Sequence, residues 1–139
     1  IIAWMKKNLD SIPLQTCKVE AGFPSPADNY IEKKLNLNQY LIKNPEATFL
    51  VRATGESMID SGIFSGDILI VDKSLEVSNN SIVIASIDGD LTVKRFVKGN
   101  GLKSSYLVSE NSEYPSIELK NDCDLEIWGV VTHSIHQLR

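Results

Sequence analysis

The feature that most restricts the fold of this chain is the dipeptide Asp88-Gly89, which separates two runs rich in β-branched residues. One run covers residues 81–87 and the other covers residues 90–97. Asp-Gly is typical of a type I′ turn, because both central residues of that turn need a positive φ, and the turn joins two antiparallel strands. The segment therefore predicts a β-hairpin.

Other short β-rich runs lie on both sides of this hairpin, bounded by residues that favour turns. The pair Asn100-Gly101 predicts a second tight turn. The further expected strands are residues 49–53, 67–72, 106–108, 116–119 and 125–131. About six or seven short strands separated by turn signals predict a mainly β fold, a partly open β-barrel or sandwich of short, largely antiparallel strands.

The first 28 residues differ from the rest because they contain three of the 5 prolines. Proline interrupts a helix and biases the residue before it toward an extended conformation. We interpret residues 1–28 as an extended N-terminal arm, ahead of one domain that covers residues 29–139. The apolar residues of the arm indicate that it docks on another surface; they are Ile12, Leu14, Val19 and Phe23.

The fold is expected to contain one or two short helices. Asn36 and Asn38 are alternative N-caps for a helix that runs through Ile42 and is stopped by Asn44-Pro45. A helical turn is also expected to begin at Met58, just after a bend in the chain.

Composition excludes several functions for this chain of 139 residues. Its formal net charge is −4, whereas a domain that holds DNA through phosphates carries a basic stripe, so direct sequence-specific DNA binding is not expected. The two cysteines, Cys17 and Cys123, show no metal-ligand spacing, so we expect neither a metal site nor a disulfide framework. No apolar run approaches the length of a membrane span. A cytoplasmic protein without a cofactor is the expectation.

Ser57 is the candidate nucleophile. A predicted strand ends at Ala53, and Gly55 permits a sharp bend directly before the serine. A serine at such a bend exposes its hydroxyl beside outward-pointing backbone N–H groups, which are the parts of a nucleophile and an oxyanion hole. The alternative is a turn in which the serine is a capping residue, and local sequence alone favours that alternative.

A serine nucleophile needs a base. His133 and His136 lie three residues apart on an expected strand, hence on opposite faces, and we interpret both as surface or edge histidines. Lys94 is the other candidate, because alternation places it on one strand face with Phe96. An apolar surrounding lowers a lysine pKa, and the neutral amine can then take a proton from a serine hydroxyl. The alternative is an edge-strand lysine that discourages aggregation.

Five blocks of sequence in this order resemble the LexA/UmuD family of self-cleaving Ser–Lys peptidases. The blocks are residues 21–26, 55–60, 66–72, 88–95 and 110–115. The resemblance covers about residues 19–139, and it is to the short UmuD-like branch rather than to the repressors. It implies the β fold of the LexA C-terminal domain.

The resemblance also implies roles for matching residues. Ser57 would be the nucleophile and Lys94 the general base of a serine endopeptidase. The backbone N–H groups of Glu56 and Ser57 would form the oxyanion hole. The chain would cut itself between Ala21 and Gly22.

The partners implied by the resemblance belong to the SOS response to DNA damage. They are a second copy of the chain, a RecA–single-stranded-DNA filament that stimulates cleavage, and a UmuC-type subunit of an error-prone translesion polymerase. The replicative sliding clamp is a further candidate partner. Two alternatives stay open: the C-terminal part of a LexA- or phage-type repressor, and a non-catalytic β-domain that binds partners.

Overall fold

The computed structural model describes residues 11–14, 19–22, 33–99, 105–118 and 125–139. The chain divides into two compact units, residues 1–43 and residues 44–139. The predicted boundary between residues 28 and 29 lies outside the described residues, as does Phe23 of the arm.

The first unit contains a small sheet and a short helix. Strand β1 (Ile12–Leu14) pairs antiparallel with strand β2 (Lys33–Leu35), so part of the predicted arm is a paired strand. Helix α2 (Leu37–Leu41) begins after Asn36, whose side chain accepts a hydrogen bond of 3.1 Å from the Gln39 N–H. This selects Asn36 from the two predicted caps and satisfies one free N–H of the first turn.

The second unit is an antiparallel sheet of seven strands in the order β3-β4-β9-β5-β6-β7-β8. Among the described residues, the two end strands of this order, β3 and β8, do not pair with each other, so the sheet is not a closed barrel. The predicted fold class, mainly β with largely antiparallel strands and few helices, is confirmed. The elements are η1 (Pro45–Ala47), β3 (Thr48–Arg52), η2 (Ile59–Ser61), β4 (Ile68–Asp72), β5 (Ile82–Ile87), β6 (Asp90–Val97), β7 (Tyr106–Val108), β8 (Ile117–Glu118) and β9 (Leu125–Ile135).

Strands β5 and β6 form the predicted hairpin. Asp88 has φ 50° and Gly89 has φ 90°, as a type I′ turn requires. Ile87 pairs with Asp90 across the turn, and the register continues to the pair Ile82 and Arg95. The second predicted turn, at Asn100-Gly101, lies outside the described residues.

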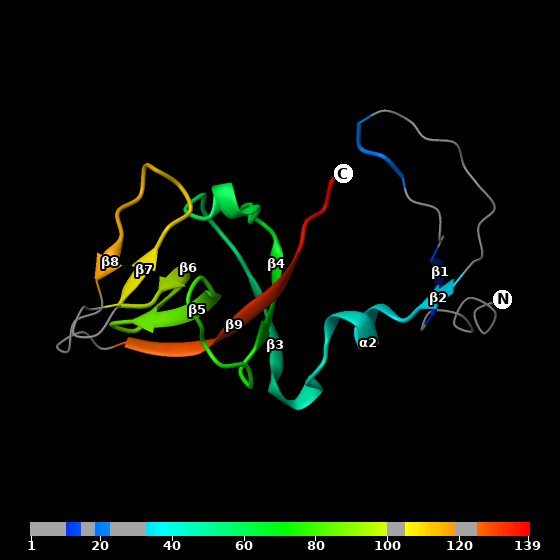
Figure 1. Ribbon diagram of the computed structural model, residues 1–139, viewed down its shortest axis with the longest axis horizontal. Helices are drawn as coiled ribbons and strands as arrows, with labels where there is room; N and C mark the ends of the chain where they lie inside the picture. The colour runs from blue at the N-terminus through cyan, green and yellow to red at the C-terminus, as the bar shows by residue number, and fades with distance from the viewer. Residues whose placement is uncertain (1–10, 15–18, 23–32, 100–104, 119–124) are drawn as a thin grey trace. The chain divides into compact units, whose positions relative to one another are not determined.

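Strand β9 joins the two halves of the sheet (Figure 1). Its first half pairs with β5 and its second half pairs with β4, with a register shift in each ladder. The strand continues to Ile135, beyond the predicted end at residue 131. Gly129 of β9 lies very close to β4, because a Cβ atom at this position would stand 2.8 Å from the side chain of Val71.

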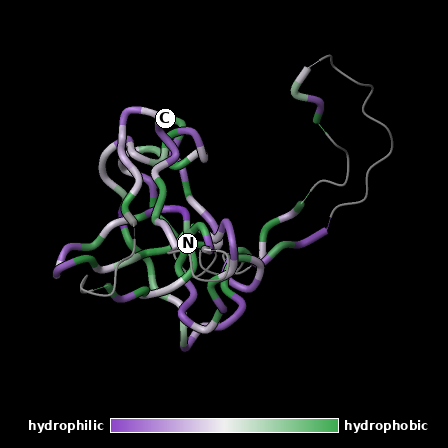
Figure 2. The backbone as a smooth tube through the Cα atoms, turned by 60° about the vertical axis from the view of Figure 1, so that its left-hand side comes forward, coloured by the Kyte–Doolittle hydropathy of each residue, from purple (hydrophilic) through white to green (hydrophobic). Residues whose placement is uncertain are grey.

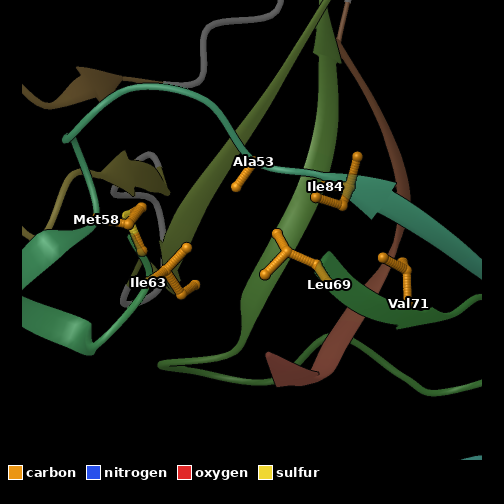
Figure 3. Packing of buried hydrophobic residues seen from close by; sticks show 6 residues of the cluster. All are labelled: Ala53, Met58, Ile63, Leu69, Val71 and Ile84. Carbon is orange, nitrogen blue, oxygen red and sulfur yellow. The ribbon is translucent and has the colours of Figure 1, made fainter. Parts of the chain in front are cut away.

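The core of the second unit consists of two groups of buried side chains. The smaller group contains Val83, Ala85 and Leu107. The larger group packs between β3, β4, β5 and the segment that follows β3 (Figure 3); it contains Ala53, Met58, Ile63, Leu69, Val71 and Ile84. In Figure 2 hydrophobic and hydrophilic stretches follow one another along the backbone of this unit. Because Met58 is buried in the larger group, the core fixes the position of the neighbouring Ser57.

Among the described residues, no helix is long and apolar enough to cross a membrane.

Candidate active site

Ser57 lies on a sharp bend that leaves the end of β3. Gly55 has φ +88°, a conformation that favours glycine, and its N–H donates to the Ser65 hydroxyl at 3.1 Å. The Glu56 carbonyl then accepts a hydrogen bond of 3.2 Å from the Ile59 N–H. The predicted bend and the helical turn after Met58 are thus both present, and Ser57 itself is half-buried.

The backbone N–H groups of Glu56 and Ser57 donate to no acceptor among the described residues. A pair of uncommitted N–H groups beside a serine hydroxyl can bind an anionic oxygen. This arrangement is compatible with the predicted oxyanion hole, whose role stays a prediction.

A cleft of about 170 Å³ opens beside the bend. Ser57 lines it together with parts of four strands, so the serine faces a space that a peptide backbone could enter. The other lining residues are Val51, Arg52, Ala53 and Thr54 from β3 and the chain after it, Leu69 from β4, Ile84 from β5, and Leu91, Thr92 and Val93 from β6.

Lys94 follows this cleft lining directly along β6. Its side chain is buried, with 7% of its surface exposed, and burial lowers the pKa of its amine. The amine donates a hydrogen bond of 2.8 Å to the Ser109 hydroxyl and lies 5.8 Å from the centre of the Tyr114 ring. Because β6 lies between β5 and β7, the alternative of an edge-strand lysine is wrong.

One short segment connects the lysine to the serine bend. Residues 109–111 follow β7, and Ser109 accepts the hydrogen bond from Lys94. The Asn111 side-chain amide donates to the Glu56 carbonyl at 2.9 Å, and the Glu110 carbonyl accepts from the Asp60 N–H at 2.7 Å. The lysine and the bend are therefore held by the same three residues.

No hydrogen bond joins the Ser57 hydroxyl to the Lys94 amine among the described residues. Catalytic hydrogen bonds are often long in a site without substrate and shorten when the substrate binds. The Ser57–Lys94 pair accordingly stays a prediction, supported by the cleft and by the shared segment.

The two histidines lie outside the cleft lining. The His133 ring on β9 contacts the Thr132 hydroxyl at 3.0 Å. His136 follows β9, and its Nδ1 lies 2.6 Å from a carboxylate oxygen of the buried Asp67. The pKa of Asp67 is lowered, chiefly by the hydrogen bond from the Phe64 N–H and further by His136. Neither histidine contacts Ser57, in keeping with their interpretation as surface or edge residues.

Ala21 and Gly22, the predicted cleavage site, are exposed in the first unit. Of the apolar arm residues, Ile12, Leu14 and Val19 are exposed as well. Cys17 and Cys123 lie outside the described residues. Among the described residues, no cluster of three or more His, Cys, Asp or Glu side chains could hold a metal ion.

Sequence reasoning did not find Ser109, Asn111 or Tyr114. The block at residues 110–115 was part of the resemblance, yet no role followed from it. One signal was available: in the antiparallel register Arg95 pairs with Val108, and continuing this register by one residue places Ser109 opposite Lys94. That register depends on the length of the connection between β6 and β7, which the residues alone did not fix.

Comparison with known proteins agrees with the resemblance. The family model described as Peptidase S24-like matches residues 13–132. The chain is 45% identical over 127 residues to protein ImpA of Salmonella typhimurium, covering 91% of this chain and 85% of ImpA. It is 43% identical over 126 residues to protein MucA of Escherichia coli, covering 90% of this chain and 84% of MucA.

A repressor is also among the relatives. The chain is 42% identical over 114 residues to the LexA repressor of Pseudomonas chlororaphis, covering 81% of this chain and 55% of the repressor. ImpA and MucA are UmuD homologues, so the resemblance to the short branch is confirmed. With the family model matching most of its length, this chain belongs to the peptidase S24-like family.

Proposed function

We propose that the chain is a serine endopeptidase that cuts its own Ala21-Gly22 bond with Ser57 as nucleophile and Lys94 as general base. The observation that carries this proposal is the buried amine of Lys94, which burial keeps closer to its neutral form, directly after the strand residues that share a cleft with Ser57. A neutral amine is what a serine hydroxyl needs as a proton acceptor.

The chemistry follows from these groups. The Lys94 amine takes the Ser57 hydroxyl proton while the serine oxygen bonds to the Ala21 carbonyl carbon. The N–H groups of Glu56 and Ser57 bind the oxyanion of the tetrahedral intermediate. The Lys94 ammonium then gives its proton to the departing Gly22 nitrogen, and the peptide bond breaks.

Water completes the reaction. It attacks the Ser57 ester and passes a proton to Lys94, and Ser57 regains its hydroxyl proton as the ester bond breaks. The products are residues 1–21 and residues 22–139, and the second product has 139 − 21 = 118 residues. Because the substrate bond is part of the same chain, its effective concentration at the cleft can be high without strong binding.

The decisive experiment follows self-cleavage of the purified full chain as the pH is raised to about 10, near the ordinary pKa of lysine. We expect a fragment of residues 22–139, identified by intact mass, to form faster as the pH rises. Ser57→Ala and Lys94→Met should both abolish it. Ser112→Ala, a change at an exposed serine, and Lys98→Met, a change at an exposed lysine after β6, should cleave like the unchanged chain. Cleavage that persists in Ser57→Ala would refute the proposal.

The biological setting is part of the same proposal and rests on family membership. The shortened chain would act as a homodimer, as the accessory subunit of a UmuC-type translesion polymerase. A RecA–single-stranded-DNA filament would stimulate cleavage. Adding such filaments at neutral pH should accelerate formation of the 22–139 fragment, and RecA without DNA should not. An unchanged rate would remove RecA from the proposal without touching the peptidase chemistry.

A further inference from the structure

The only hydrogen bond of the Lys94 amine among the described residues goes to a side chain that has no role in the proposed chemistry. Ser109 is 8% exposed, and its hydroxyl accepts from Lys94 Nζ at 2.8 Å. Both groups are buried, so bulk water does not take over this hydrogen bond if it is lost. A buried polar contact of this kind restricts where the end of a lysine side chain can go.

The backbone determines where the Ser109 hydroxyl lies. Arg95 pairs with Val108, so Ser109 follows β7 directly opposite Lys94. On the other side, Lys94 pairs with the fully buried Val83 of β5, which offers no polar side chain. Lys94 thus has an apolar partner on one neighbouring strand and the Ser109 hydroxyl on the other side.

The segment that carries Ser109 is itself held by three further contacts. Asn111 and Glu110 bond to the bend that carries Ser57, as described above, and the Glu110 carboxylate is ion-paired with Arg95. The Ser109 hydroxyl therefore has a fixed position relative to both β6 and the serine bend.

We propose that Ser109 is a positioning residue for Lys94, whose hydroxyl accepts one amine N–H and thereby leaves the remaining face of the amine available to Ser57. The inference rests on the proposed function. A neutral amine has two N–H groups and one lone pair. If one N–H is held by Ser109, the orientation of the lone pair is restricted, and less orientational freedom has to be lost when Ser57 gives up its proton.

The contact also influences the charge of Lys94. The ammonium form gains more from an acceptor than the neutral form does, because hydrogen bonds from charged donors are stronger. Among the described residues, the segments next to Lys94 carry these charged groups: Glu110 is ion-paired with Arg95, and Glu56 and Asp60 are exposed. The centre of the Tyr114 ring lies 5.8 Å from the amine. Removal of the Ser109 hydroxyl should therefore favour the neutral amine while loosening its position.

These two effects give a pattern that simple loss of packing does not. In Ser109→Ala, the midpoint of the pH–rate profile of self-cleavage should move to lower pH, because the neutral amine is favoured. The plateau rate at high pH should fall by about tenfold or more, because the amine is no longer held. Ser109→Thr keeps the hydroxyl and should restore both the midpoint and most of the plateau rate. Ser112→Ala, in the same connection but exposed, should change neither.

A second readout does not depend on cleavage. In the Ser57→Ala chain, the titration of the Lys94 amine is followed by NMR of its side-chain nitrogen, with and without Ser109→Ala. The expected result is a lower titration midpoint when the Ser109 hydroxyl is absent. An unchanged midpoint together with an unchanged pH–rate profile overturns the inference and leaves the proposed function intact. A shifted midpoint in a chain that never cleaves supports the contact and refutes the proposed function instead.

Discussion

Replacement of Lys94 by methionine should remove one pH-dependent component of the stability of the fold. Burial lowers the Lys94 pKa in the folded chain below the ordinary value of 10.5. Above pH 10.5 the amine is neutral in both states and contributes nothing. As the pH falls from there, the unfolded chain binds the proton first, so the folded state loses stability until the pH reaches the folded-state pKa.

The size of the effect follows from linkage. Between the folded and unfolded pKa values, one group can change the free energy of unfolding by at most about 1.36 kcal/mol per pH unit. Methionine has a similar length, is apolar and does not titrate. Loss of the partner of Ser109 costs about 1–3 kcal/mol in the methionine variant. That cost is the same at every pH, so the change of the difference with pH isolates the titration of Lys94.

The assay is urea unfolding of two proteins between pH 7.5 and pH 11, the Ser57→Ala chain and the same chain with Lys94→Met. The Ser57→Ala background prevents self-cleavage under the proposed mechanism. The stability of the lysine protein relative to the methionine protein should increase as the pH rises toward the ordinary lysine pKa. Lys98→Met serves as the control, since it changes an exposed lysine and keeps Lys94, so the pH dependence of the Ser57→Ala chain should be retained. A constant difference for Lys94→Met would refute the reasoning.

Three further outcomes are expected. Asn111→Ala removes the side-chain hydrogen bond to the serine bend, so stability should fall by about 1 kcal/mol in urea unfolding and the plateau rate of self-cleavage by about tenfold. Gly129→Ala places a methyl group against β4 and should cost about 1–3 kcal/mol in the same assay, whereas the exposed Ser134→Ala on the same strand should cost nothing. The pKa of Asp67 is lowered in the folded chain, so the ionised carboxylate stabilises the fold at pH values above the ordinary pKa of 3.8. This stabilisation is lost as the pH falls below 3.8. Asp67→Asn should therefore lose less stability on acidification than the unchanged chain, measured by thermal melting from pH 6 to pH 2.

The parts of the fold that sequence predicted are those that short-range physics determines. The β5–β6 hairpin follows from the conformation that Asp88 and Gly89 favour, and the helix after Asn36 follows from its cap. The strand order does not follow in this way, because β9 separates β4 from β5 although it is last in the chain. Its length to Ile135 depends on pairing with β4, and no local signal in residues 132–135 reports that pairing.

The same distinction between local and long-range determinants applies to the candidate site. The bend at Ser57 was predictable because it depends on local residues: the preceding strand ends nearby, and Gly55 permits the sharp bend. Alternation predicted the face of Lys94 but not its burial, because the groups beside the amine, the Ser109 hydroxyl and the Tyr114 ring, come from the distant segment after β7. Ser109 carries no motif of its own, and its contact with Lys94 exists only through the β6–β7 register.

The proposed mechanism sets two independent conditions for self-cleavage, and they can be separated. The Ala21-Gly22 bond must reach the cleft, and the Lys94 amine must be neutral; the rate is proportional to the product of the two fractions. High pH satisfies only the second condition, so the plateau rate of the pH profile measures how often the bond is docked. A stimulating filament that favours docking would raise the plateau without moving the midpoint, because it changes a population and not a proton affinity. A filament that acts on the lysine would move the midpoint and leave the plateau unchanged. Because the lysine is already buried, we expect the first pattern.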